Sequence, residues 1–280
     1  MLISLVMATY GRYEEIDRFI LSLANQELAA EKFELIIVDQ NDVIEISDIV
    51  ERYKYKLNIR HIRSKKKGLS FNRNIGLQYA KAELVGFPDD DCTYYPDTLS
   101  SVLEKLHNPK INAVFGAIRD RQGKDIIRKW PSTSTHLNRW NFFFLYSSIT
   151  LFCRKKDILF NELLGAGCFF GSYEDADFTY QLVKCKGGCV YYPDVQVWHP
   201  PIGITEFSSE KNISYSLGFG GFCASHKWDI YILRIFFLSI AYHFALAIYE
   251  AITLQKQKSA KRWSSVFYKI VGFLKYPRHD

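Results

Sequence analysis

The chain of 280 residues is long enough for one large domain, or for a domain with an appendage. Apolar residues make up 48% of it, with 21 Phe and 18 Tyr, which excludes a disordered protein and allows a packed core. The net charge is +6, but residues 251–280 alone carry seven Lys or Arg and one acid. Residues 1–250 are therefore neutral, which disfavours a nucleic-acid groove, and the basic tail suits anionic lipid or nucleic acid.

Strands and helices alternate in the first part of the chain. Apolar runs predict strands at residues 3–8, 33–38, 57–62 and 84–87. Helical spacing of apolar residues predicts helices within residues 13–28, 44–53 and 68–80, and Ser70 is a possible cap of the last one. This alternation indicates an α/β fold in which helices flank a mostly parallel sheet.

The pattern becomes less regular after residue 95. It predicts helices at 96–106 and 175–183, strands at 113–118, 149–152, 190–192 and 195–198, and a mobile loop at 119–140. Residues 235–249 are apolar apart from His243, and this run is shorter than the ~20 residues that span a bilayer. It predicts a helix that is buried in a pair or lies in a membrane interface, and a soluble helical subdomain is the alternative.

Polar side chains follow three of the predicted strands. Thr9, Asp39 and the triplet Asp89–Asp91 each stand where a strand ends. Because ligands of parallel sheets bind beyond the carboxyl ends of the strands, these residues predict a site at one sheet edge. Three adjacent carboxylates repel one another unless a cation compensates them, so the triplet suits Mg²⁺ or Mn²⁺ bound to phosphates. A solvated acidic turn is the alternative.

Two further groups of residues could take part in chemistry. Lys65–Lys67 precede a predicted helix that carries Arg73 and Asn74, so this segment could hold phosphates or be a solvated run of charge. Glu174, Asp175 and Asp177 open another predicted helix, where carboxylates are also common for capping alone. A second acidic cluster facing the first would suit metal-assisted group transfer, with one cluster holding the donor and the other deprotonating the acceptor.

Four segments, in this order and spacing, resemble the family 2 glycosyltransferases, which have the GT-A fold. They are Leu5-Val-Met-Ala-Thr-Tyr-Gly-Arg12, Ile36-Ile-Val-Asp-Gln-Asn41, Gly68-Leu-Ser-Phe-Asn-Arg-Asn-Ile-Gly76 with Val85-Gly-Phe-Pro-Asp-Asp-Asp-Cys92, and Leu164-Gly-Ala-Gly167 with Gly171-Ser-Tyr-Glu-Asp-Ala-Asp177. The resemblance covers about residues 1–225. It implies a GT-A (Rossmann-like) sheet with a nucleotide-binding half at 1–110, an acceptor-binding half at 111–212 and a C-terminal helical extension at 213–280.

The resemblance also implies roles for single residues. The nucleotide site would comprise Thr9, Tyr10, Arg12, Asp39, Arg73, Asn74, Asp89 and Asp90. Asp91 and Asp89 match the family's DxD acids and would bind Mn²⁺ or Mg²⁺, and His199 is a further candidate ligand, an acceptor contact or a structural histidine. Asp175 matches the catalytic base, with Glu174 and Asp177 as supporting or alternative carboxylates. The sequence departs from the family at Gly11, where Asn is common, and at Gln40, where an acid is common.

These roles predict an inverting transfer from a nucleotide sugar, with UDP as the nucleotide, to a saccharide or lipid-linked acceptor in surface polysaccharide synthesis. The basic tail predicts a cytoplasmic enzyme that sits peripherally on the inner face of the plasma membrane, with no nucleic-acid partner. One alternative is a nucleotidyltransferase that makes sugar nucleotides, although its usual glycine-rich basic loop after the first strand is missing. Another is a catalytically inactive, membrane-bound assembly partner.

Overall fold

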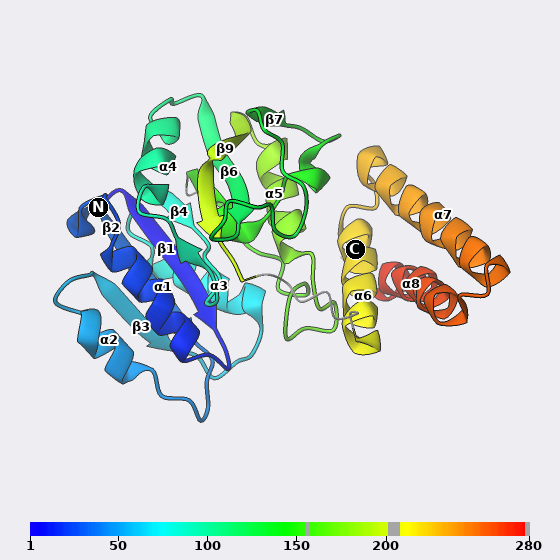
Figure 1. The fold of residues 1–280 in the computed structure, drawn as a ribbon, viewed down its shortest axis with the longest axis horizontal. Helices are drawn as coiled ribbons and strands as arrows, with labels where there is room; N and C mark the ends of the chain where they lie inside the picture. Colours follow the sequence, from blue (N-terminus) through cyan, green and yellow to red (C-terminus); the bar gives the residue numbers. More distant parts are fainter. Residues whose placement is uncertain (155–156, 201–207, 278–280) are drawn as a thin grey trace. The chain divides into compact units, whose positions relative to one another are not determined.

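The computed structural model in Figure 1 describes residues 1–154, 157–200 and 208–277. The chain divides into two compact units. Unit 1 comprises Met1–Leu159 and Phe178–Gly203, and unit 2 comprises Phe160–Asp177 and Ile204–Asp280. Residues 160–177 therefore group with the C-terminal helices, whereas the sequence segments placed them with 111–212.

One sheet contains all the strands of the described residues. They are β1 (Ile3–Thr9), β2 (Phe33–Asp39), β3 (Ile59–Arg63), β4 (Leu84–Gly86), β5 (Thr93–Tyr94), β6 (Ile111–Arg119), β7 (Thr135–Leu137), β8 (Phe152–Arg154) and β9 (Gly188–Trp198). Their order is β3-β2-β1-β4-β8-β6-β9-β5, and β7 pairs with β9 (Figure 1). β1 pairs in parallel with both β2 and β4, and its register sets Thr9 beside Asp39.

The sheet is mostly parallel, as predicted. β3, β2, β1 and β4 run in one direction, and antiparallel β8 joins them to β6 and β9, which run the same way. Every residue of β1 and β2 is buried, which explains why both strands are mainly apolar. The predicted α/β class is therefore confirmed.

Helices cover this sheet and carry residues to its edge. They are α1 (Glu14–Ala24), α2 (Ser47–Tyr53), α3 (Leu69–Tyr79), α4 (Thr98–Leu106) and α5 (Glu174–Lys184). Short 3₁₀ turns occur at Ala30–Lys32, Phe142–Phe144 and Ser148–Thr150. α3 follows Gly68, whose φ of 130° favours glycine, and Ser70 lies buried inside the helix. The prediction that Ser70 caps this helix is therefore wrong.

Several elements in the middle of the chain differ from those predicted, because long-range packing overrides the local sequence pattern. The predicted mobile loop contains β7, and Trp130 within it is only 4% exposed because its ring stacks on Tyr191. The predicted strand at 149–152 is instead a 3₁₀ turn followed by β8. The two strands predicted around residue 193 form the single strand β9, which has an irregular register against β6.

Unit 2 is mainly helical. It contains α6 (Ser209–Ser225), α7 (Ile230–Ile252) and α8 (Lys256–Lys275), and α8 packs against both other helices. A Cβ added to Gly220 would lie 2.1 Å from the carbonyl oxygen of Lys269, and one added to Gly272 would lie 2.3 Å from that of Leu217. Glycine at these positions therefore permits the close approach of α6 and α8.

α7 is longer than the apolar run that predicted it. Its 23 residues are enough, by length and composition alone, to cross a membrane, and only 17% of its most apolar window is buried. The exposed large apolar side chains of α7 and α8 are Ile230, Phe237, Leu238, Tyr242, Phe244, Ile248, Tyr249, Ile252, Trp263, Phe267, Ile270 and Leu274. Together these side chains make the exposed face of α7 and α8 strongly apolar.

The charge of the C-terminal segment is less exposed than its sequence indicates. Lys269 is 6% exposed, its Nζ lies 2.6 Å from the Oγ of Ser239, and burial lowers its pKa to about 8. Arg262 is half-buried beside Glu250. Lys269 is therefore not available to a membrane surface, because it is buried by the packing of α8.

Candidate active site

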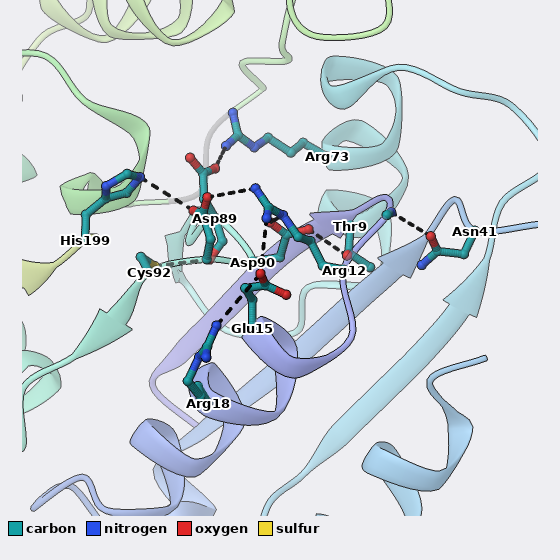
Figure 2. A network of polar contacts seen from close by, with 12 residues as sticks. Thr9, Arg12, Glu15, Arg18, Asn41, Arg73, Asp89, Asp90, Cys92 and His199 are labelled. Carbon is teal, nitrogen blue, oxygen red and sulfur yellow. Dashed lines mark hydrogen bonds and ion pairs between the residues drawn. The ribbon is translucent and has the colours of Figure 1, made fainter. Parts of the chain in front are cut away.

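Three carboxylates crowd the turn that follows β4, and two arginines from other elements compensate them (Figure 2). Arg73 of α3 donates a hydrogen bond of 2.6 Å to the Oδ1 of Asp89. Arg12, from the loop after β1, donates to the Oδ2 of Asp91 over 3.2 Å, and its Nε lies 3.8 Å from Asp90. The turn is therefore held between β1 and α3.

The carboxyl of Asp90 lies deepest in this network, beside the end of β1. Its Oδ2 accepts a hydrogen bond of 2.7 Å from the Oγ1 of Thr9. Desolvation raises the pKa of Asp90 to about 6, and the neighbouring carboxylates add to the rise, while the bond from Thr9 and the charge of Arg12 oppose it. Desolvation likewise raises the pKa of Asp89, against the opposing charge of Arg73. Added positive charge would relieve this crowding.

Asp39, at the end of β2, is fixed by its neighbours. Its Oδ1 accepts hydrogen bonds of 2.8 Å from the backbone and side-chain nitrogens of Asn41, and its Oδ2 lies 3.0 Å from the Nε2 of His61. Although burial alone would raise it, the bonds from His61 and Asn41 lower the pKa of Asp39. Asp39 therefore presents a rigid, ionised acceptor at the sheet edge.

The departure from the family at Gly11 has a backbone explanation. Gly11 has a φ of 76°, which glycine and asparagine adopt more easily than other residues. Its N–H donates a hydrogen bond of 2.7 Å to the Oδ1 of Asn41, so the loop after β1 is tied to the loop after β2. Glycine thus keeps the turn that asparagine would also allow.

Gln40 and Lys67, the last residue of the lysine run, also contact the loops at this edge of the sheet. The Oε1 of Gln40 accepts a hydrogen bond of 2.8 Å from the N–H of Gly68, which fixes the loop before α3. Lys67 lies with its Nζ 4.5 Å from the ring centroid of Tyr10, which is 60% exposed. Tyr10 therefore offers an exposed aromatic face, with a cation beside it, next to Asp39.

His199, just after β9, reaches the same acidic turn. Its Nε2 lies 3.6 Å from the Oδ1 of Asp91, and its Nδ1 lies 2.7 Å from the carbonyl oxygen of Pro200. Because a carbonyl oxygen can only accept, the neutral ring carries its proton on Nδ1 and has a lone pair on Nε2. Two aspartates and an imidazole lone pair suit Mn²⁺ or Mg²⁺, although no three His, Cys, Asp or Glu side chains among the described residues already form a metal cluster.

The second acidic group lies in unit 2, at the start of α5. Glu174 is buried and Asp175 is half-buried. Asp177 is 2% exposed and lies 2.8 Å from the Nε2 of His226. The three carboxylates thus have different surroundings.

Sequence reasoning missed several residues that shape the site. His61 lies within β3, where the alternating pattern gives no sign of a link to Asp39. Asn41 stands inside a recognised segment, but only the turn of the backbone brings it to Gly11. Ser148, which lies 3.2 Å from Arg73, comes from a 3₁₀ turn far along the chain. Asn74, by contrast, was predicted, and it is buried in α3.

The two arginines should differ in their effect on stability. The side chain of Arg73 is 1% exposed and that of Arg12 is 41% exposed, although both contact carboxylates of the same turn. We expect Arg73→Met to lower the free energy of unfolding by about 2 kcal/mol or more, and Arg12→Met by less than about 1 kcal/mol. Urea unfolding followed by tryptophan fluorescence measures both. Equal losses would contradict this account of the site.

Comparison with known proteins identifies the family. A model of "Glycosyl transferase family 2" matches residues 4–175. The chain is 24% identical over 225 residues to the poly(ribitol-phosphate) β-N-acetylglucosaminyltransferase TarP of Staphylococcus aureus, covering 78% of this chain and 67% of TarP. The chain thus spans about two thirds of that relative.

Solved structures share the fold. TarS residues 1–349 of S. aureus, in complex with UDP-GlcNAc, match with a TM-score of 0.63 and 22% identity over 78% of this chain and 66% of that one. The mannosyltransferase PcManGT of Pyrobaculum calidifontis, with GDP-Man and Mn²⁺, matches with a TM-score of 0.65 and 14% identity over 98% and 87%. The GT-A fold is confirmed, and because the family model covers more than half of its length, the chain belongs to glycosyl transferase family 2.

Proposed function

We propose that the protein is an inverting glycosyltransferase that uses a UDP-sugar and a saccharide or lipid-linked hydroxyl acceptor in surface polysaccharide synthesis. The observation that carries the proposal is the sheet edge where three carboxylates, two arginines and the buried Asp39 meet. Such an edge can hold a nucleoside and its diphosphate together. The name of TarP and the UDP-GlcNAc bound to TarS support this choice of donor.

The nucleotide would bind across the ends of β1 and β2. The residues proposed for it are Thr9, Tyr10, Arg12, Asp39, Arg73, Asn74, Asp89 and Asp90. Asp39 is suited to a ribose hydroxyl because its position is fixed by two neighbours. The exposed ring of Tyr10 is suited to stack on a base.

A divalent cation would be held by Asp89, Asp91 and His199. When bound, it would supply several kcal/mol of charge stabilisation to the departing diphosphate. The residues themselves keep the ligand atoms ready: Arg73 orients Asp89, Arg12 orients Asp91, and the carbonyl of Pro200 sets the ring of His199.

Asp175 is proposed as the base. It would take the proton of the acceptor hydroxyl while that oxygen bonds to the anomeric carbon, and the bond from this carbon to the diphosphate would break with its electron pair. Attack from the opposite face inverts the configuration. Within unit 1, the ring of Phe178, three residues after Asp175 in α5, lies 5.2 Å from the ring of Phe87, which is two residues before Asp89.

Replacing the base should separate chemistry from binding. We expect Asp175→Asn to lower the rate of UDP release from UDP-GlcNAc by about 10²–10⁴ because the amide cannot accept the proton, with the affinity for UDP unchanged. Asp97→Asn, the same change at an exposed residue, is the control and should retain full rate. Normal turnover in Asp175→Asn would exclude this residue as the base. If the unaltered protein instead released pyrophosphate from UTP and a sugar phosphate, it would be a nucleotidyltransferase.

Nucleotide binding should depend on a divalent cation. We expect UDP with Mn²⁺ at 100 times its dissociation constant to stabilise the protein by about 2.7 kcal/mol, and UDP with EDTA to stabilise it much less. Thermal unfolding with UDP, GDP, UDP-GlcNAc and GDP-mannose, each with Mn²⁺ or EDTA, measures this. A preference for GDP would reject the proposed nucleotide, and a shift that survives chelation would reject the cation.

The C-terminal helices are proposed to seat the enzyme on the cytoplasmic face of a membrane. The exposed apolar face of α7 and α8 supports this proposal, together with basic side chains near the turn between them. Lys256, Lys258 and Lys261 line a surface hollow of about 420 Å³ there. Charge favours anionic lipid over a second copy of this face, because two copies would bring like charges together.

Lysines in α8 should govern attachment to vesicles. We expect the full chain to sediment with vesicles that contain 30% phosphatidylglycerol, and the triple change of Lys256, Lys258 and Lys261 to Gln to weaken binding about a hundredfold, at about 1 kcal/mol per charge. Changing Lys32, Lys54 and Lys56, which are exposed in unit 1, to Gln is the matched control. Indifference of the unaltered chain to anionic vesicles at low salt, or dimers that form instead, would overturn the proposal.

A further inference from the structure

Helix α6 lies unusually close to the loop that leads into α5. A Cβ added to Gly218 would lie 2.2 Å from the Oγ of Ser172 and 2.7 Å from its carbonyl oxygen, and one added to Gly221 would lie 2.6 Å from the ring of Phe170. Real Cβ atoms do not approach backbone so closely. The Gly218-Phe-Gly-Gly221 sequence therefore lets the backbone of α6 pack directly on residues 170–172.

The next residue of this loop is in a strained conformation. Tyr173 has a φ of 70°, a left-handed backbone that a bulky side chain adopts at a cost of about 1–2 kcal/mol. Its ring lies 5.4 Å from that of Phe219 and stacks on that of Phe222 at 6.1 Å, and both rings come from α6. The packing on α6 thus offsets the strain immediately before Glu174 and Asp175.

The end of α6 holds the first turn of α5 from its other side. Asp177 is buried, and its Oδ1 lies 2.8 Å from the Nε2 of His226 and 3.4 Å from the Oγ of Ser225. Its N–H donates a hydrogen bond of 3.0 Å to the carbonyl oxygen of Tyr173. The stretch that contains Asp175 is therefore fixed at both ends by one helix, and Asp177 is already engaged in that role.

We propose that α6 is a positioning element for the base, and that His226 and Asp177 are its positioning residues. His226 holds Asp177, Asp177 holds the first turn of α5, and that turn sets the direction of the Asp175 carboxylate. The inference rests on the proposed role of Asp175 as the base. It gives a function to the glycine-rich start of the C-terminal region and to a histidine that the transfer reaction does not itself require.

His226 variants test this positioning. We expect His226→Ala to lower the maximal rate of UDP release from UDP-GlcNAc at least tenfold, while the KM for UDP-GlcNAc and the dissociation constant of UDP change less than twofold. His226→Gln should recover most of the rate, because its amide can donate to Asp177 from nearly the same place. Asp229→Ala is the matched control, since it removes the side-chain cap of α7 in the same connection without touching Asp177.

A second readout does not depend on the donor. Hydrogen exchange of the peptide spanning 170–180 should accelerate in His226→Ala, because the backbone amide of Asp177 is no longer held in its turn. Exchange of this peptide should remain near normal in His226→Gln. Unchanged exchange and rate in His226→Ala would overturn the inference, as would an equal loss of rate in Asp229→Ala. Parallel assay of Asp175→Asn separates the two proposals, since full activity there rejects the base itself.

Two glycines of α6 provide a further matched pair. Gly218→Ala places its Cβ against Ser172, whereas Gly220→Ala places it against α8. We expect Gly218→Ala to accelerate exchange of peptide 170–180 and to lower the rate of UDP release, and Gly220→Ala to leave that peptide closer to normal. If helix propensity alone mattered, Gly218→Ala would show slower exchange and the full rate. That result would count against the close packing.

Discussion

Mutual repulsion of the three carboxylates after β4 is the constraint on which the sheet edge depends. In a partly desolvated turn, carboxyl groups ionise only with difficulty unless positive groups compensate their charge. Arg12 and Arg73 supply that compensation from the loop after β1 and from α3, so three elements distant in sequence are drawn to one place. The same arrangement would suit the proposed diphosphate if it binds together with a cation.

The two arginines that compensate the acidic turn differ in how firmly they are held. Arg12 is exposed and its contacts are long, whereas Arg73 is buried and its contact is short. Surface ion pairs of the first kind contribute little to stability and reorganise easily. Arg73 is therefore part of the fixed framework of the turn, whereas the ion pairs of Arg12 contribute little to stability.

Unit 2 is organised around α6, which uses glycine on two faces. Gly218 and Gly221 admit the loop before α5, and Gly220 admits α8. Backbone contacts of this kind leave little freedom for either neighbour to shift alone, because packed interiors transmit displacement rather than absorb it. The proposed membrane-seated pair of α7 and α8 and the proposed base therefore rest on the same helix.

The sequence by itself determined the α/β class, the strands β1 to β4, the helices α1 to α3, and the clustering of acids at strand ends. These follow from local periodicity, since an apolar run or a helical stripe needs no distant information. The buried stripe of α1 and the fully buried β1 and β2 agree with it. The family likewise follows from short segments whose order and spacing are visible in one dimension.

Only the tertiary structure decided which partner each polar group has. His61 meets Asp39, His226 meets Asp177, and Lys269 is withdrawn from the surface, each through contacts between residues more than twenty positions apart. The same is true of the single strand β9, the burial of Trp130 and the left-handed Tyr173. Sequence periodicity records whether a side chain prefers water, but pairing of charges and rings depends on where distant backbones meet, which is set by the packing of the whole unit.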